Sequence, residues 1–316
     1  MALLRIEDLN IDYMTLRGRL RAVKNASLTL GEGEWLSIVG ESGSGKSTLA
    51  MAIPGLLLPP GRITSGRIIF QGRDLTGMSG DELRRIRGSE IGVVFQDPLT
   101  SLDPLRTIGD QMVEAIMEHR AAGSKREALE MASAALESVG IPGNRVKYYP
   151  HQLSGGQRQR VMIAMAVMLK PRLLIADEPT TALDVIVQAS IMRLLKSLQR
   201  KMGMSIILIT HDIALAAEVS DRIAVMYAAE IVEEGPAEQV IEEPLHPYTE
   251  ALIKSTPDLW REKTLYSIPG NPPDLRNPPS GCRFHPRCHK AFEPCKSREP
   301  RPTRIRDRMV ACHLYG

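Results

Sequence analysis

A glycine-rich segment that ends in Lys46 and Ser47 is the first part of the chain whose residue types could do chemistry. It reads Gly-Glu-Ser-Gly-Ser-Gly-Lys-Ser and matches the G-x-x-x-x-G-K-[ST] phosphate loop. Its glycines let successive backbone N–H groups point at phosphate oxygens, Lys46 adds a positive charge, and the Ser47 hydroxyl can bind magnesium. A Gly/Ser turn with a coincidental lysine is disfavoured, because the motif lies between an apolar run and a helical pattern. The residues expected to bind a nucleotide are Gly40, Glu41, Ser42, Gly43, Ser44, Gly45, Lys46, Ser47 and Thr48.

A second segment, Leu173 to Pro179, places two carboxylates directly after an apolar run. Asp177 can hold magnesium, directly or through water, and Glu178 can orient or deprotonate an attacking water. Alone, this pattern is weak, because acidic residues often follow such strands. Together with the phosphate loop, it predicts nucleotide hydrolysis.

The elements that must position these residues are short apolar strands that alternate with amphipathic helices. This pattern is typical of an α/β fold with a mostly parallel sheet covered by helices. Each strand ends in polar residues, at the edge where open α/β sheets bind ligands. Three such strands are expected, at Glu34–Val39, Arg172–Ala176 and Ser205–Ile209.

Helices are expected where apolar residues recur at helical spacing. One such segment runs from Asp184 to Met202, with Gly203 as its C-cap. Between Gln96 and Leu153 the pattern contains helices alone, at Thr107–His119 and Ser124–Val139. We therefore expect a helical subdomain, at about residues 97–160, inserted into the sheet domain.

Charge and composition change sharply toward the C-terminus. The chain carries 40 Lys+Arg and 37 Asp+Glu, a net charge of +3. From Cys282 onward, nine Lys+Arg face three Asp+Glu, a local balance of +6, so the rest of the chain sums to −3. That balance gives no support for nucleic-acid binding. Ten of the 22 prolines fall between Pro257 and Pro302, and we therefore expect a domain at 1–256 and an extension at 257–316.

Apolar runs are short throughout the chain, and none approaches the ~20 residues that a membrane helix needs. The N-terminal segment carries Arg5, Glu7 and Asp8 where a signal peptide would have its apolar core. We therefore expect an intracellular chain without membrane spans.

The segment Leu153-Ser-Gly-Gly-Gln157 resembles the signature motif of ABC ATPases, and further family marks occur in the family's order. Gln96 is similar to the residue of the glutamine loop, Ala182-Leu-Asp184 to the D-loop, and His211 to the switch histidine. Tyr13 is the aromatic residue expected to stack on adenine. The resemblance covers about residues 1–256 and implies a P-loop NTPase fold of the ABC type that binds ATP and Mg²⁺.

The family resemblance also implies a role for each matched residue. Glu178, His211 and Gln96 would be catalytic, and Ser47, Gln96 and Asp177 would hold magnesium. The signature and D-loop would complete the nucleotide site of an opposite subunit, through Ser154, Gly155, Gly156, Gln157 and Asp184. Two plainer interpretations stay open, because a histidine at a strand end is more often structural and Asp184 could be a simple helix cap.

Within the ABC ATPases, the chain resembles the ATP-binding subunits of dipeptide and oligopeptide importers. The stretches that carry this resemblance are Gln96 to Pro104, His246-Pro-Tyr-Thr249 and the cysteine-bearing tail. It implies an ATPase on the cytoplasmic face of the cell membrane, peripherally bound to two transmembrane permease subunits. A second ATPase subunit, a paralogue or a second copy, and an extracellular solute-binding protein would complete the importer. Its cargo would be peptides, a nickel chelate or an oligosaccharide.

The alternative is a soluble ABC ATPase that acts on DNA or ribosomes. DNA-repair members carry long coiled-coil heptads, and no such repeat is visible between Gln96 and Leu153. Ribosome-recycling members carry two ATPase domains and an N-terminal cysteine cluster, which this sequence does not match. The sequence therefore favours the transporter.

All four cysteines lie in the basic tail, at Cys282, Cys288, Cys295 and Cys312. A reducing compartment disfavours disulfides, and the spacings of five, six and sixteen intervening residues match neither common zinc knuckles nor ferredoxins. The residues alone thus indicate a four-thiolate metal site, with four unligated thiols as the alternative. Resemblance to the importer group favours a 4Fe–4S cluster over zinc.

Overall fold

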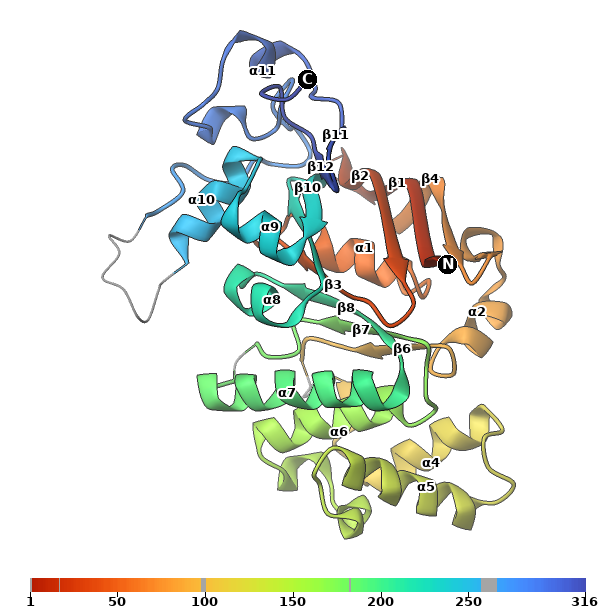
Figure 1. The fold of residues 1–316 in the computed structure, drawn as a ribbon. Coiled ribbons are helices and arrows are strands. Elements are labelled where there is room, and N and C mark those ends of the chain that lie inside the picture. The colour runs from red at the N-terminus through yellow and green to blue at the C-terminus, as the bar shows by residue number, and fades with distance from the viewer. Residues whose placement is uncertain (1, 17, 98–100, 182, 257–265) are drawn as a thin grey trace. The chain divides into compact units, whose positions relative to one another are not determined.

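The computed structural model describes residues 2–16, 18–97, 101–181, 183–256 and 266–316. The chain divides into two compact units. The first consists of Met1–Gly77 together with Leu208–Gly316, and the second consists of Met78–Ile207. Figure 1 shows the elements of both along the chain.

The first unit begins with a four-stranded antiparallel sheet in the order β2-β1-β4-β5. The second half of β2 alternates buried and exposed side chains, with Ala26, Leu28 and Leu30 buried, which is the pattern of a sheet with one covered face. In β1, by contrast, four successive residues from Leu9 to Asp12 are buried. The strands are β1 (Ala2–Thr15), β2 (Gly18–Gly31), β4 (Gly61–Phe70) and β5 (Arg73–Asp74).

The second sheet of this unit has the strand order β11-β12-β10-β9-β3-β8. All five residues of β3 are buried, and β9 runs parallel to β3, with Val39 opposite Val225. β12 pairs antiparallel with β10, so the C-terminal hairpin extends the sheet. The strands are β3 (Trp35–Val39), β8 (Ser205–Thr210), β9 (Arg222–Tyr227), β10 (Glu230–Pro236), β11 (Thr303–Ile305) and β12 (Arg308–Val310).

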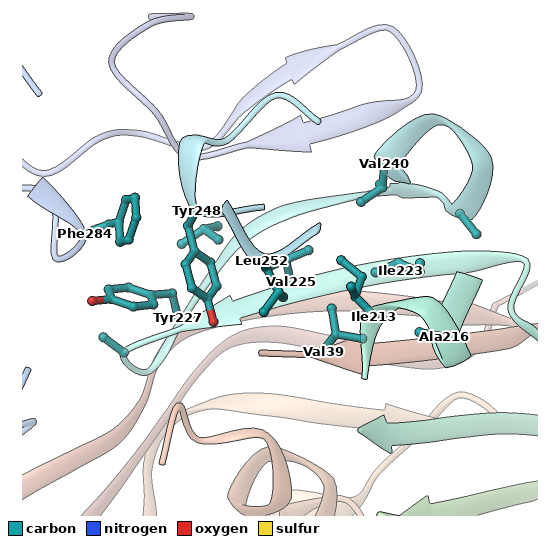
Figure 2. Packing of buried hydrophobic residues seen from close by; sticks show 13 residues of the cluster. Val39, Ile213, Ala216, Ile223, Val225, Tyr227, Val240, Tyr248, Leu252 and Phe284 are labelled. Carbon is teal, nitrogen blue, oxygen red and sulfur yellow. The ribbon is translucent and has the colours of Figure 1, made fainter. Parts of the chain in front are cut away.

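Helices and one core cluster complete the first unit. The cluster unites Val225 and Tyr227 of β9 with Tyr248 and with Phe284 of the C-terminal extension (Figure 2). The extension therefore shares its core with the sheet. The helices are α1 (Lys46–Ala52), α8 (Ile213–Val219), α9 (Ala237–Glu242), α10 (Pro247–Ser255) and α11 (Glu293–Ser297), with 3-10 turns η1 (Leu75–Gly77) and η4 (His285–Arg287).

The second unit combines a parallel strand pair with helices. β6 pairs parallel with β7, and Val94 lies opposite Ala176. The strands are β6 (Ile91–Val94) and β7 (Leu173–Asp177). The helices are α2 (Gly80–Ile86), α4 (Ile108–Glu118), α5 (Lys125–Ser138), α6 (Gly155–Val167) and α7 (Val185–Met202), with 3-10 turns η2 (Gly143–Lys147) and η3 (Pro150–Gln152).

Helix caps found in the second unit agree with the sequence signals. Thr107 and Ser124 cap α4 and α5 by accepting backbone N–H bonds, and Gly203 ends α7 in the left-handed conformation with φ 67°. The expected strands and helices are therefore confirmed, with ends that shift by a residue. The boundary expected near residue 257 falls on residues 257–265, which lie outside the described residues.

Candidate nucleotide-binding site

The phosphate loop connects β3 to α1 in the first unit. Gly40 has φ 154°, and a Cβ there would lie 2.1 Å from the Met226 carbonyl oxygen. Gly45 has φ 103°, and its Cβ would lie 2.1 Å from the Ala22 carbonyl oxygen. Both positions therefore exclude any side chain, which explains why the loop needs glycine at its two ends.

Lys46 closes the phosphate loop. Its side chain is buried at 4% exposure, and its ammonium group donates to the carbonyl oxygens of Gly40 and Glu41, both at 2.8 Å. Ser47, which follows it in α1, is exposed, and Thr48 is half-buried. Ser42 and Gly43 at the tip of the loop are exposed, whereas Ser44 is buried. The ammonium group of Lys46 is thus held at the start of the loop, where it supplies the positive charge that phosphate groups require.

Glu41, the second residue of the loop, has partners that sequence reasoning missed. Its carboxylate accepts two hydrogen bonds from the Arg287 guanidinium, at 2.7 and 3.0 Å. Its backbone N–H donates to the Tyr248 hydroxyl at 2.9 Å. Burial raises the pKa of Tyr248, so this hydroxyl stays protonated. The only sequence signal was the position of these residues beside the His246-Pro-Tyr-Thr249 motif and the cysteines.

His211 and Tyr13 also belong to the first unit. His211 directly follows β8, the neighbour of β3 in the sheet, and its side chain is exposed. Tyr13 lies near the end of β1, opposite Leu20 of β2 and Gly61 of β4. Its ring packs so closely on Gly61 that a Cβ at that glycine would lie 2.7 Å from it.

In the second unit, Gln96, Asp177 and Glu178 meet at one sheet edge. The parallel register of β6 and β7 brings together the residues that follow Val94 and Ala176. Gln96 Nε2 donates to Glu178 Oε2 at 2.9 Å, although 82 positions separate these residues. The Thr181 hydroxyl, a contact that the sequence did not indicate, donates to the same oxygen at 2.9 Å. Asp177 is buried at 7% exposure.

Glu178 itself has a left-handed backbone, with φ 45°. This conformation is uncommon for a residue with a side chain and is concentrated at functional sites. The backbone turn and the two hydrogen bonds fix the direction of the carboxylate. The geometry suits a group that must hold or accept a proton at a defined place.

The signature segment begins α6. The Ser154 hydroxyl accepts from the Gln157 N–H at 3.3 Å, and the Gln157 side chain accepts from the Ser154 N–H at 3.0 Å. This capping box explains the Ser-x-x-Gln spacing locally. Gly156 lies so close to α7 that a Cβ would be 2.9 Å from Val187, and Gly155 precedes it in the same turn.

Asp184 caps α7, because its carboxylate accepts the Val187 N–H at 2.9 Å. The following residues, Val185 and Ile186, are exposed at 72% and 79%. Two apolar side chains therefore face solvent beside the cap. Ala182 of the expected D-loop lies outside the described residues, as do residues 98–100 of the expected glutamine loop.

The four cysteines are free thiols that line one cavity of the first unit, together with Phe284 and His246. Burial, with a smaller contribution from the neighbouring thiols, raises the pKa of Cys282 to about 12. Burial also raises the pKa of Cys288 and Cys312. However, the described residues contain no group of three or more His, Cys, Asp or Glu side chains that could hold a metal ion. The expected 4Fe–4S cluster therefore has no support beyond the shared cavity.

A buried strand, a phosphate loop closed by lysine, and a capped Ser-Gly-Gly-Gln helix start define a P-loop ATPase of the cassette type. Comparison with known families agrees, since the family ABC transporter matches residues 23–181. A second match, Oligopeptide/dipeptide transporter, C-terminal region, spans residues 232–295. The chain therefore belongs to the ATP-binding proteins of ABC transporters, which confirms the resemblance and the fold expected from the sequence.

Individual relatives match over nearly the whole chain. The dipeptide transport ATP-binding protein DppD of Haemophilus influenzae is 47% identical, covering 99% of this chain and 96% of its own. The oligopeptide transport ATP-binding protein OppD of Bacillus subtilis is 48% identical, covering 96% of this chain and 86% of its own. Among solved structures, the ATP-binding cassette MJ0796, dimeric and bound to ADP and phosphate, aligns with a TM-score of 0.67 at 34% identity. That alignment covers 74% of this chain and 98% of the cassette.

Every helix within the described ranges is too short or too polar to span a bilayer.

Proposed function

We propose that this chain is the ATP-hydrolysing subunit that energises a membrane importer of dipeptides or oligopeptides. The observation that carries this proposal is the similarity, over 99% of the chain, to dipeptide transport ATP-binding proteins. The match at residues 232–295 extends it to the C-terminal region. The oligosaccharide cargo expected as an alternative gains no support from these comparisons, and nothing in them favours action on DNA or ribosomes.

In this function, the phosphate loop and Lys46 bind the phosphates of ATP, and Tyr13 stacks on adenine. Glu178 accepts the proton of the attacking water, and the hydrogen bond from Gln96 supports its orientation. His211 contacts the γ-phosphate. Magnesium, held by Ser47, Gln96 and Asp177, would neutralise charge on the phosphates.

The second half of the site comes from another ATPase subunit. Ser154, Gly155, Gly156, Gln157 and Asp184 would close on nucleotide bound to that subunit. The exposed Val185 and Ile186 beside Asp184 support an apolar contact there. We propose that the second subunit is a paralogue, or otherwise a second copy, and that the pair binds two transmembrane permease subunits on the cytoplasmic face. A solute-binding protein would deliver the peptide from outside.

The division of labour follows the regions expected from the sequence. Residues 1–256 would form the ATPase domain, with the helical subdomain at about 97–160, and residues 257–316 the extension.

We propose that Cys282, Cys288, Cys295 and Cys312 hold one 4Fe–4S cluster, with zinc as the alternative. The cavity that all four thiols line supports this site. Anaerobically purified chain should be brown and contain about four irons. Colourless protein with one zinc per chain would contradict the cluster.

The function is tested by assembling the chain with the two permeases and the second ATPase in lipid vesicles. ATP hydrolysis should rise several-fold when peptide-loaded binding protein is added, and should not rise with unloaded binding protein. Failure of the chain to co-purify with any permease pair, or hydrolysis indifferent to peptide, would overturn the proposal.

A further inference from the structure

Glu41 of the phosphate loop is joined to a residue 246 positions away in the C-terminal extension. Arg287 Nη1 donates to one carboxylate oxygen at 2.7 Å, and Nη2 donates to the other at 3.0 Å. The Arg287 side chain is only 5% exposed, and that of Glu41 is 24% exposed. This is a two-pronged and largely buried ion pair, the strong form of the Arg–carboxylate contact.

Several further contacts fix the guanidinium of Arg287. Its Nε donates to the Pro269 carbonyl oxygen at 2.8 Å, and Nη1 lies 3.3 Å from the Tyr227 hydroxyl. Tyr227 packs against Tyr248 and Phe284 in the core cluster, with ring centroids 4.5 and 5.1 Å apart (Figure 2). Because the Tyr248 hydroxyl accepts the Glu41 N–H, the same cluster holds both the backbone and the side chain of Glu41.

Arg283, which lies with Arg287 in the segment from Cys282 to Cys288, supports the phosphate loop through a neighbouring turn. Arg283 Nη1 donates to the carbonyl oxygen of Ala228, in the turn between β9 and β10. The next residue in that turn, Ala229, donates its N–H to the Ser44 carbonyl oxygen at 2.8 Å. The segment from Cys282 to Cys288 thus reaches the loop at Glu41 directly and at Ser44 through one turn.

We propose that Arg287 is a positioning residue for nucleotide binding, which sets the phosphate loop through Glu41. Arg287 neutralises a carboxylate that would otherwise place negative charge beside the triphosphate of ATP. It also ties the start of the loop to a rigid aromatic core. The inference rests on the proposed function, since it takes the loop as the ATP site.

The test measures binding of a fluorescent ATP analogue to the isolated full chain, where hydrolysis and permeases play no part. The variants are Arg287→Ala, Arg287→Lys, Glu41→Ala and the double variant Arg287→Ala/Glu41→Ala. Arg276→Ala is the matched control, because Arg276 makes an equally two-pronged pair with Asp274 in the same extension, but on the exposed surface.

Arg287→Ala should weaken binding by about tenfold or more, the size expected when one partner of a largely buried ion pair is removed. Arg287→Lys should fall between it and the wild type, since an ammonium cannot make the two-pronged contact. Glu41→Ala should lose less affinity for the ATP analogue than Arg287→Ala. The double variant should bind the analogue as Glu41→Ala does, because no unpaired carboxylate remains. Arg276→Ala should bind like the wild type.

The charge-reversed pair, Glu41→Arg with Arg287→Glu, separates positioning from general damage. Binding that recovers beyond either single reversal supports the inference and shows that the chain is folded. Unchanged binding in Arg287→Ala would overturn it, and so would losses that simply add in the double variant. If the wild-type chain binds no ATP analogue, the proposed function fails instead.

Discussion

At the scale of single residues, the fold prepares Glu178 for its chemistry by restricting it. The left-handed backbone of this residue costs ~1–3 kcal/mol, which the rest of the structure must offset. In return, the carboxylate is aimed by hydrogen bonds from Gln96 and Thr181. A group held in this way needs little rearrangement when a reaction begins, and that is the physical basis of its proposed role as the base.

Glu178→Gln should preserve ATP binding and slow hydrolysis by ~100-fold or more, because the amide keeps the shape but cannot accept the proton. Phosphate release and ATP-analogue binding would be measured side by side. Thr181→Val serves as the control for the neighbouring hydrogen bond and should cost far less. Near-normal phosphate release by Glu178→Gln would remove Glu178 from the role, provided the partner ATPase is inactivated in the same way.

At the scale of elements, one residue that caps a helix also belongs to the proposed nucleotide site. Ser154 caps α6 through a capping box, and Ser79 caps α2 through the same arrangement with Glu82. The two serines therefore make the same kind of cap. Only Ser154 belongs to the signature segment.

Ser154→Ala and Ser79→Ala should each lower the free energy of unfolding by about 1 kcal/mol, the usual cost of a lost N-cap. Only Ser154→Ala should also reduce ATP hydrolysis by the paired ATPase subunits, because only that serine is proposed to contact nucleotide on the opposite subunit. Denaturant unfolding and phosphate release would be measured for both. Equal losses of hydrolysis in the two variants would show that Ser154 acts through stability alone.

Elements with local signals were predictable from the sequence, and contacts between distant segments were not. Helix ends lie at residues that favour caps, such as Gly203, Thr107 and Asp184, because capping depends on a few neighbouring residues. The meeting of Gln96 with Glu178 follows from parallel strands that end at one edge. No comparable rule connects Glu41 with Arg287.

The C-terminal extension was the least predictable part of the fold. Its strands β11 and β12 are three residues each, too short to show a period in the sequence. Their pairing with β10 and the insertion of Phe284 into the core depend on long-range packing. The clustering of all four cysteines in the tail indicated a shared location, and all four line one cavity.

At the scale of the whole molecule, we expect two ATPase subunits to associate only when ATP is bound. In the proposed assembly, the signature segment and the phosphate loop act on opposite subunits. Nucleotide would then form part of the interface, and association would depend on its concentration. Light scattering of the Glu178→Gln chain, alone and with its paralogue, should show dimers in ATP and monomers without it. A tight dimer in nucleotide-free buffer would contradict this.

The central claim, that this ATPase drives peptide import, is tested most directly by uptake of a labelled dipeptide or oligopeptide into cells. Cells that lack the chain would receive either the wild-type chain or Glu178→Gln at equal abundance. We expect the wild-type chain to restore uptake and Glu178→Gln to leave uptake at the level of the deletion. Peptide uptake that is equal with both chains, or that never depended on the chain, would contradict the account.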